Sequence, residues 1–244
     1  MNSKYTNFWL WLLVLTLFSA ATAQARENNG LPTQKPIPIS GKTAAACSPA
    51  TASIELNVNN VRTRLLSAGD MWWNLQDARY EVPKVEPGSG RPSIHSLFAG
   101  ALWIGGIDAL GQLKVAAQTY RQTGNDFWPG PLDDDGNTND EVCGQFDRFW
   151  EVRSKDIDDY LALVSAQDGG DASADVTIPA GSIPLSILKW PGRNNAYADI
   201  SLPEDKNLAP FWDRDGDNDY DPTKGDYPVI DSKTQGVYAD QMIW

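Results

Sequence analysis

The chain has 244 residues and a formal net charge of −12 at pH 7, from 20 basic and 32 acidic side chains. This balance argues against binding to nucleic acid or anionic lipid, and it favours solubility and cation binding. A chain of this length can build one large domain or two small ones.

The N-terminus has the pattern of a secretory signal peptide over residues 1–23. Lys4 gives the positive start, residues 8–20 form an apolar run too short to span a membrane comfortably, and Ala21–Ala23 is a small-x-small cleavage site. An uncleaved anchor, the alternative, needs a longer apolar run. We therefore expect a secreted, extracellular protein at the cell surface, with no membrane span in the mature chain.

Residues 24–52 are rich in Pro, Thr, Asn, Ala and Ser and predict a flexible linker. Alternating polar and apolar residues predict that structure begins at about Ser53. An apolar run broken by glycines and the segment after it predict a hairpin that turns around Asp108–Gly111. The expected strands are 53–58, 61–66, 97–106, 112–120 and 146–152.

One helix is predicted from Ser154, which can cap it, with Asp156 in its first turn. Its apolar residues Ile157, Tyr160, Leu161 and Val164 recur at helical spacing. A second, short helix is expected within 183–190. Residues 53–244 therefore predict a mainly β fold: an antiparallel β-sandwich-like domain with one or two short helices and long loops.

Two cysteines, Cys47 and Cys143, are present. In an exported protein such a pair predicts one disulfide, worth about 4 kcal/mol in the chain-entropy model, although two free buried thiols remain the alternative. The single histidine, His95, offers no partner for a catalytic cysteine, and a structural or surface role is expected for it.

The strongest candidate site is the acidic stretch 211–228. Its aspartates recur at every second position, as in loops that wrap Ca²⁺ with carboxylates and one backbone carbonyl. Asn218 falls at the sharp turn, and Lys224 stands where a bidentate Glu is usual, so that Asp226 has to replace it. A solvated acidic turn without an ion is the alternative. The predicted Ca²⁺ ligands are Asp213, Asp215, Asp217, Asp219 through its carbonyl, Asp221 and Asp226.

A second acidic stretch, 133–140, crowds its acids at adjacent positions. Adjacent side chains of an extended loop point in different directions, so we expect a solvated surface loop there and no second ion.

Several long segments resemble the N-terminal region of large secreted surface proteins of gliding Bacteroidota, and the acidic stretch resembles the loops of dockerin and thrombospondin type 3 repeats. The resemblance implies export by type IX secretion and a C-terminal sorting domain. Because residues 237–244 show a strand-like pattern and no such domain, we expect a fragment, with a natural end as the alternative. The segments are 57–62, 69–73, 78–83, 96–106, 116–121, 124–132, 147–150 and 225–228.

Tryptophan is frequent, with ten residues, of which Trp9 and Trp11 lie in the leader. Trp72, Trp73 and Trp128 are candidates for stacking on sugar rings, with burial in the core as the alternative.

No GxSxG, HExxH or P-loop motif is present, so a non-enzyme is expected. The predicted function is a calcium-stabilised domain of an exported cell-surface protein, with a structural or adhesive role and with surface glycans or other surface proteins as partners. A carbohydrate-binding module is the first alternative. A glycan-active hydrolase is the second, because a glycosidase needs only two carboxylates.

Overall fold

The computed structural model describes residues 47–118, 126–133, 137–204 and 206–244. The predicted signal peptide and residues 24–46 of the predicted linker lie outside these ranges. In the described part every strand pair is antiparallel, and three α-helices accompany the strands. The predicted mainly β, antiparallel fold is therefore confirmed.

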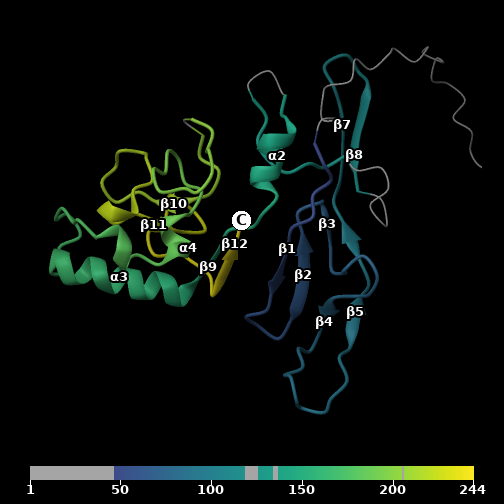
Figure 1. Cartoon of the computed structure of the whole chain (residues 1–244), viewed down its shortest axis with the longest axis horizontal. Coiled ribbons are helices and arrows are strands. Elements are labelled where there is room, and N and C mark those ends of the chain that lie inside the picture. The colour runs from purple at the N-terminus through teal and green to yellow at the C-terminus, as the bar shows by residue number, and fades with distance from the viewer. Residues whose placement is uncertain (1–46, 119–125, 134–136, 205) are drawn as a thin grey trace, which may run out of the picture. The chain divides into compact units, whose positions relative to one another are not determined.

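The largest sheet has six short strands in the order β5-β4-β2-β3-β6, with β1 paired to β2 (Figure 1). The strands predicted at 53–58 and 61–66 are confirmed as β1 and β2, whose register joins Ser53 to Leu66 and Leu56 to Thr63. The members are β1 (Ser53–Leu56), β2 (Arg62–Leu66), β3 (Asp70–Met71), β4 (Tyr80–Glu81), β5 (His95–Leu97) and β6 (Gly100–Ala101).

The predicted hairpin is confirmed, but its first strand is shorter than expected. The run 97–106 is divided among β5, β6 and β7 (Trp103–Ile107), because residues 98–99 and residue 102 lie outside the strands. The second strand, β8 (Leu113–Ala117), pairs with β7. The Asp108 carboxylate closes the turn by accepting hydrogen bonds from the backbone amides of Leu110 and Gln112, both at 2.9 Å.

The described end of the predicted linker makes defined contacts. The Asp147 carboxylate accepts hydrogen bonds from Thr51 N at 2.8 Å and Ala52 N at 2.9 Å, and from Ser67 Oγ at 2.6 Å. Ala50 is buried. Residues 47–52 therefore belong to the folded part, since their backbone donors find a carboxylate 95 residues later in the chain.

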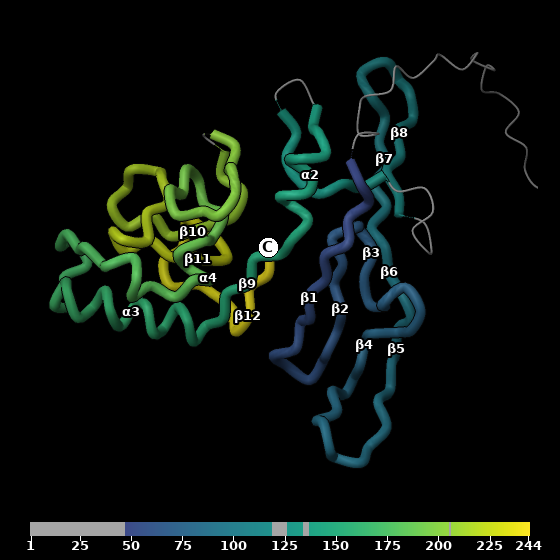
Figure 2. Tube along the Cα trace, viewed as in Figure 1, coloured from purple at the N-terminus to yellow at the C-terminus, as the bar shows by residue number. Residues whose placement is uncertain are grey.

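One helix was not predicted. Helix α2 (Asp140–Phe146) begins after Asn139, whose side chain accepts a hydrogen bond from Val142 N at 2.9 Å. The strand expected at 146–152 is present only as β9 (Glu151–Arg153): Phe146 is the last residue of α2, and residues 147–150 belong to no helix or strand. Strand β9 pairs with β12 (Gln241–Ile243), beside which the chain ends (Figure 2).

The predicted main helix is α3 (Ser154–Asp168). Ser154 is its first helical residue rather than its cap; the cap position is Arg153, which makes no side-chain capping bond. The helix ends at Asp168, and the left-handed Gly169 caps it by donating its amide to the Ser165 carbonyl. The short helix expected within 183–190 is α4 (Leu185–Leu188).

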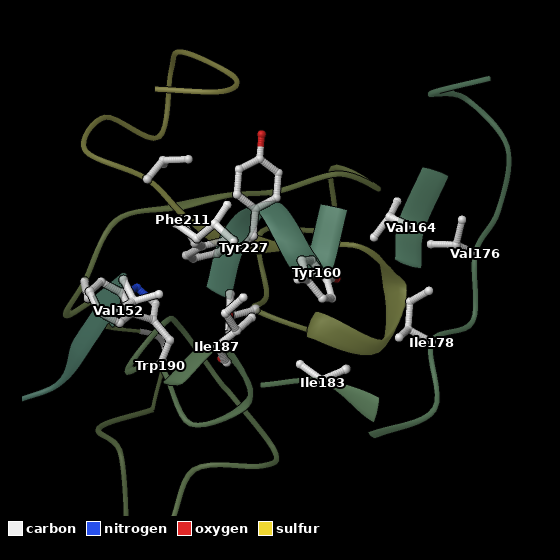
Figure 3. Packing of buried hydrophobic residues seen from close by; sticks show 14 residues of the cluster. Val152, Tyr160, Val164, Val176, Ile178, Ile183, Ile187, Trp190, Phe211 and Tyr227 are labelled. Carbon is white, nitrogen blue, oxygen red and sulfur yellow. Dashed lines mark hydrogen bonds between the residues drawn. The ribbon is translucent and has the colours of Figure 1, made fainter. Parts of the chain in front are cut away.

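The predicted apolar face of α3 contributes Ile157, Tyr160 and Val164 to the main hydrophobic core. Figure 3 shows these side chains with those of α4 and of the two-stranded sheet of β10 (Phe211–Trp212) and β11 (Tyr227–Pro228). The acidic stretch is the connection between β10 and β11, so it starts and ends in this core. The cluster consists of Val152, Ile157, Tyr160, Val164, Val176, Ile178, Ile183, Ile187, Trp190, Ala209, Phe211, Tyr220, Tyr227 and Val229.

Candidate metal site

The acidic loop, residues 213–226, is fixed at both ends and near its middle. The β10–β11 pairing of Trp212 with Tyr227 closes its base. Tyr220 is only 1% exposed, packs edge-on against Phe211 and donates its hydroxyl to the Ile187 carbonyl at 2.7 Å. Tyr160 of α3 donates its hydroxyl to the Pro222 carbonyl, also at 2.7 Å. Two buried tyrosines therefore hold the loop against α3 and α4.

Three of the six predicted ligands come together. Carboxylate oxygens of Asp213, Asp215 and Asp226 lie within 4.8 Å of one another, an arrangement that could hold a metal ion. The Asp213 carboxylate also shapes the loop, because it accepts hydrogen bonds from Gly216 N at 2.7 Å and Asn218 N at 2.9 Å. Asn218 has a φ of 65°, the left-handed turn expected there.

Asp226 is the buried member, with an exposed fraction of 0%. Its two oxygens accept hydrogen bonds from the backbone amides of Arg214 and Asp221, each at 2.8 Å. Burial raises the pKa of this carboxyl to about 7, the two amides oppose the rise, and the charges of Asp213 and Asp215 add to it. A cation beside Asp226 would favour its ionised form.

Lys224 places a positive charge at the edge of the cluster. Its ammonium lies 3.0 Å from Asp215 Oδ2 and 2.9 Å from Asp217 Oδ2. The hydrogen bond that Lys224 donates to Asp217 lowers the pKa of Asp217. The hydrogen bonds to Asp217 and Asp215 in turn raise the pKa of Lys224. Lys224, which stands where a calcium loop usually has a glutamate, therefore neutralises part of the negative charge of the loop.

The side chains of two other predicted residues, Asp219 and Asp221, have hydrogen-bond partners of their own. Asp219 Oδ1 accepts a hydrogen bond from Asn194 Nδ2 at 2.8 Å. Asp221 Oδ1 caps the 3₁₀ turn η4 (Pro222–Lys224) through the amide of Thr223 at 2.9 Å. A local side-chain-to-backbone bond like that of Asp221 is common for aspartate in turns and caps.

A residue that the sequence did not single out, Arg214, joins the loop to the end of α3. Its guanidinium lies 2.9 Å from Asp168 Oδ2 and donates to the Ala174 carbonyl at 3.0 Å. Gly225 makes room for it: a Cβ there would lie 2.3 Å from Arg214 Cδ, and the φ of 106° suits glycine alone. The Arg–Gly pair in FWDRDGD…KGDYP is the only sequence trace of this contact.

The predicted cysteine pair lies together. Cys47 and Cys143 are at disulfide-bonding distance, with their Cα atoms 5.9 Å apart. Cys143 is buried on α2, and Asp140 of the same helix accepts hydrogen bonds from the amide and hydroxyl of Ser48. This part of the stretch 133–140 is thus engaged with residues 47–48, while residues 134–136 lie outside the described ranges.

The three candidate tryptophans differ. Trp73 is 1% exposed and donates its indole N–H to Asp70 Oδ2 at 2.7 Å, so it belongs to the core and cannot stack on a sugar. Trp72 and Trp128 are half-buried. The Trp72 ring lies edge-on to Tyr80 and so close to Gly100 that a Cβ there would be 2.5 Å away.

His95 lies exposed on β5, as expected for a surface residue. Its Nε2 is 3.2 Å from Ser93 Oγ, which itself donates to the buried Glu81 carboxylate at 2.6 Å. Glu81 also pairs with Arg62 at 3.1 Å across neighbouring strands. Glu81 is thus held by Ser93 and Arg62, and the Ser93 hydroxyl donates to Glu81 and not to His95.

Comparisons with protein-family models, with curated proteins and with solved structures found no match. None of the helices in the described ranges combines the length and the apolarity needed to cross a bilayer.

Proposed function

We propose that the chain is a non-catalytic, calcium-stabilised domain of an exported cell-surface protein, with a structural or adhesive role. The observation that supports this proposal is the cluster of Asp213, Asp215 and Asp226, in which one carboxylate is fully buried. Like charges at this spacing disfavour one another's ionisation, and a hard divalent cation removes that cost.

Ca²⁺ takes six to eight oxygen ligands, more than three carboxylates supply singly. Asp213, Asp215 and Asp226 would hold the ion from opposite ends of the acidic loop. The rest of the shell falls to water and to the other predicted ligands: Asp217, Asp221 and the Asp219 carbonyl. Lys224 has to release Asp215 for that carboxylate to turn fully to the ion, so lysine and calcium compete for the same carboxylate.

The effect of the ion follows from the position of the loop. Asp213 follows β10 and Asp226 precedes β11, so one ion ties together the two strands that enter the core. Extracellular calcium modules bind at about 0.1 to 1 mM. In an exported protein the ion would therefore act as a permanent clip, which suits a structural or adhesive role.

The test is the melting temperature of chelator-stripped protein, with Ca²⁺ or Mg²⁺ added back. We expect Ca²⁺ to raise it, since an ion that binds only the folded state adds about 2.7 kcal/mol at a hundredfold excess over its dissociation constant. Asp213→Asn should abolish most of the rise. Asp219→Asn is the matched control, because that carboxylate contacts Asn194 and lies outside the cluster. If Ca²⁺ does not change the melting temperature, or changes it equally in both variants, the proposal is wrong and the loop is an acidic turn without a bound ion.

Carbohydrate binding is a second candidate, supported by the partial exposure of Trp72 and Trp128. A glycan array with the wild-type chain and Trp128→Ala tests it. Binding that survives the substitution would remove Trp128 from the proposal, and an array without any binding would remove the candidate.

A further inference from the structure

The hairpin β7–β8 carries the largest concentration of exposed apolar side chains in the described part of the chain. Trp103 is 69% exposed, Ile107 74%, Leu113 73% and Val115 57%. Leu110 at the turn is 84% exposed. Exposed apolar patches of this extent on soluble proteins mark interaction sites.

The strand register places these residues on one face. Opposite partners are Trp103 with Ala117, Gly105 with Val115, and Ile107 with Leu113. Because side chains alternate along a strand, all six share one face of the hairpin, and none of them is charged. The other face carries Ile104 and Ala116, followed by Gly106 and Lys114. The hairpin is therefore two-sided, with one wholly apolar face.

This face carries no charged side chain of its own in an acidic protein. The two charged side chains of the hairpin, Asp108 and Lys114, lie 3.5 Å apart and offset each other. One carboxylate from outside the hairpin, that of Asp126, accepts a hydrogen bond from Ala117 N at 3.0 Å at the end of β8. The whole chain carries a net charge of −12, which repels a second copy over most of its surface. Two copies meet with the least repulsion at the hairpin, whereas a strongly basic partner would be attracted elsewhere.

The size of the face also suits a second copy. A two-stranded sheet is marginally stable in water and gains from an apolar surface packed on it. From their exposed fractions, the four large side chains expose on the order of 500 Å² per copy, so their complete burial in a dimer would give about 1,000 Å², the least that a specific interface needs. Gly105 and Ala117 leave low points beside Trp103 and Val115, so one copy's large residues can fit over the other's small ones.

We infer that the chain forms a symmetric dimer in which the apolar faces of two β7–β8 hairpins pack against each other. The contact is isologous: the same residues, Trp103, Ile107, Leu113 and Val115, serve on both sides. The inference is independent of the calcium proposal, since it uses no residue of the acidic loop.

The test is sedimentation velocity of the purified full chain across a dilution series from about 100 µM to below 1 µM, in the range where an interface near the lower size limit dissociates. We expect a dimer at high concentration and a monomer on dilution. The double substitution Ile107→Thr and Leu113→Thr places a β-branched residue, which suits a strand, at both positions and removes apolar surface from the face. It should weaken the dimer by at least about tenfold.

Ile104→Thr is the matched control, with the same chemical change on the opposite face of the same strand. It should leave the dimer intact. Dilution of the wild-type chain gives an answer even where a variant folds poorly. A monomer at every concentration would overturn the inference, as would equal weakening by the double substitution and by Ile104→Thr.

Discussion

The ammonium of Lys224 lies 3.0 Å from Oδ2 of Asp215, one of the three carboxylates that the structure gathers in the acidic loop. The loop thus holds an internal cation at the border of the site proposed for an external one. The carboxylates of the loop can be neutralised either by the Lys224 ammonium or by the proposed Ca²⁺.

Lys224→Gln should strengthen calcium binding and make the ion-free protein less stable. The substitution frees Asp215 and Asp217 for the ion, and it leaves their charges uncompensated when no ion is bound. Calorimetric titration should show a several-fold lower dissociation constant for Ca²⁺. Lys233→Gln, an exposed lysine outside the loop, should change nothing; the same gain in both variants would contradict competition by Lys224.

The stability of the ion-free protein should depend on pH through Asp226. Its pKa is raised from 3.8 to about 7 in the folded state, so the folded chain binds the proton more tightly than the unfolded chain does. Asp226 therefore costs nothing below about pH 4, and it destabilises the fold increasingly as the pH rises to about 7, by up to a few kcal/mol.

The comparison that isolates this group is wild type against Asp226→Asn, in chelator, between pH 4.5 and 7.5. The variant loses one backbone hydrogen bond at every pH, so the informative quantity is the change with pH. We expect the wild type to lose more stability than the variant as the pH rises, and saturating Ca²⁺ to cancel the difference. Parallel pH profiles in chelator would show that Asp226 titrates normally.

Arg214→Ala should loosen the connection between the acidic loop and the end of α3. It removes the contacts to Asp168 and to the Ala174 carbonyl, both in a partly buried setting. We expect a loss of urea resistance several times that caused by Arg91→Ala, which alters an exposed arginine. Equal losses would mean that Gly225 and β10–β11 hold the loop without the arginine.

Reduction of the Cys47–Cys143 pair should destabilise the fold by about 4 kcal/mol in the chain-entropy model. The two cysteines are 96 residues apart, so their bond restricts a long segment of the unfolded chain. Denaturant unfolding of wild type against the double variant Cys47→Ser and Cys143→Ser measures the difference. Mass spectrometry of unreduced peptides should show the cross-link, and two alkylatable thiols in exported protein would contradict it.

Residue spacing along the chain was sufficient to predict the elements whose apolar residues recur at a regular period. The alternation in β1 and β2, the β7–β8 hairpin and the buried face of α3 all follow from residue spacing. Helix α2 was missed because its start signals, the Asn139 cap and the acidic residues Asp140 and Glu141, follow directly on an acidic stretch that resembles a loop.

The site was predicted in part, for a related reason. Spacing identifies the aspartates of the loop but not the bonds that compete for them. Asp221 caps η4 and Asp219 binds Asn194, 25 residues earlier in the chain. The role of Arg214 depends on where α3 ends relative to the loop, and only the tertiary structure fixes that relation.

Strand β12 has a consequence for the order of folding. Strand β9 leads directly into α3, yet its partner is residues 241–243, about 90 residues later. The side chain of Gln241 also accepts a hydrogen bond from Asn57 N at 3.1 Å and donates one to the Glu55 carbonyl at 2.9 Å, some 185 residues earlier. Contacts of such high sequence separation form slowly, because the entropy of closing a long loop is lost before the contacts add any stability. During synthesis, β9 with Val152 therefore cannot pair with β12 until residues 241–243 have left the ribosome.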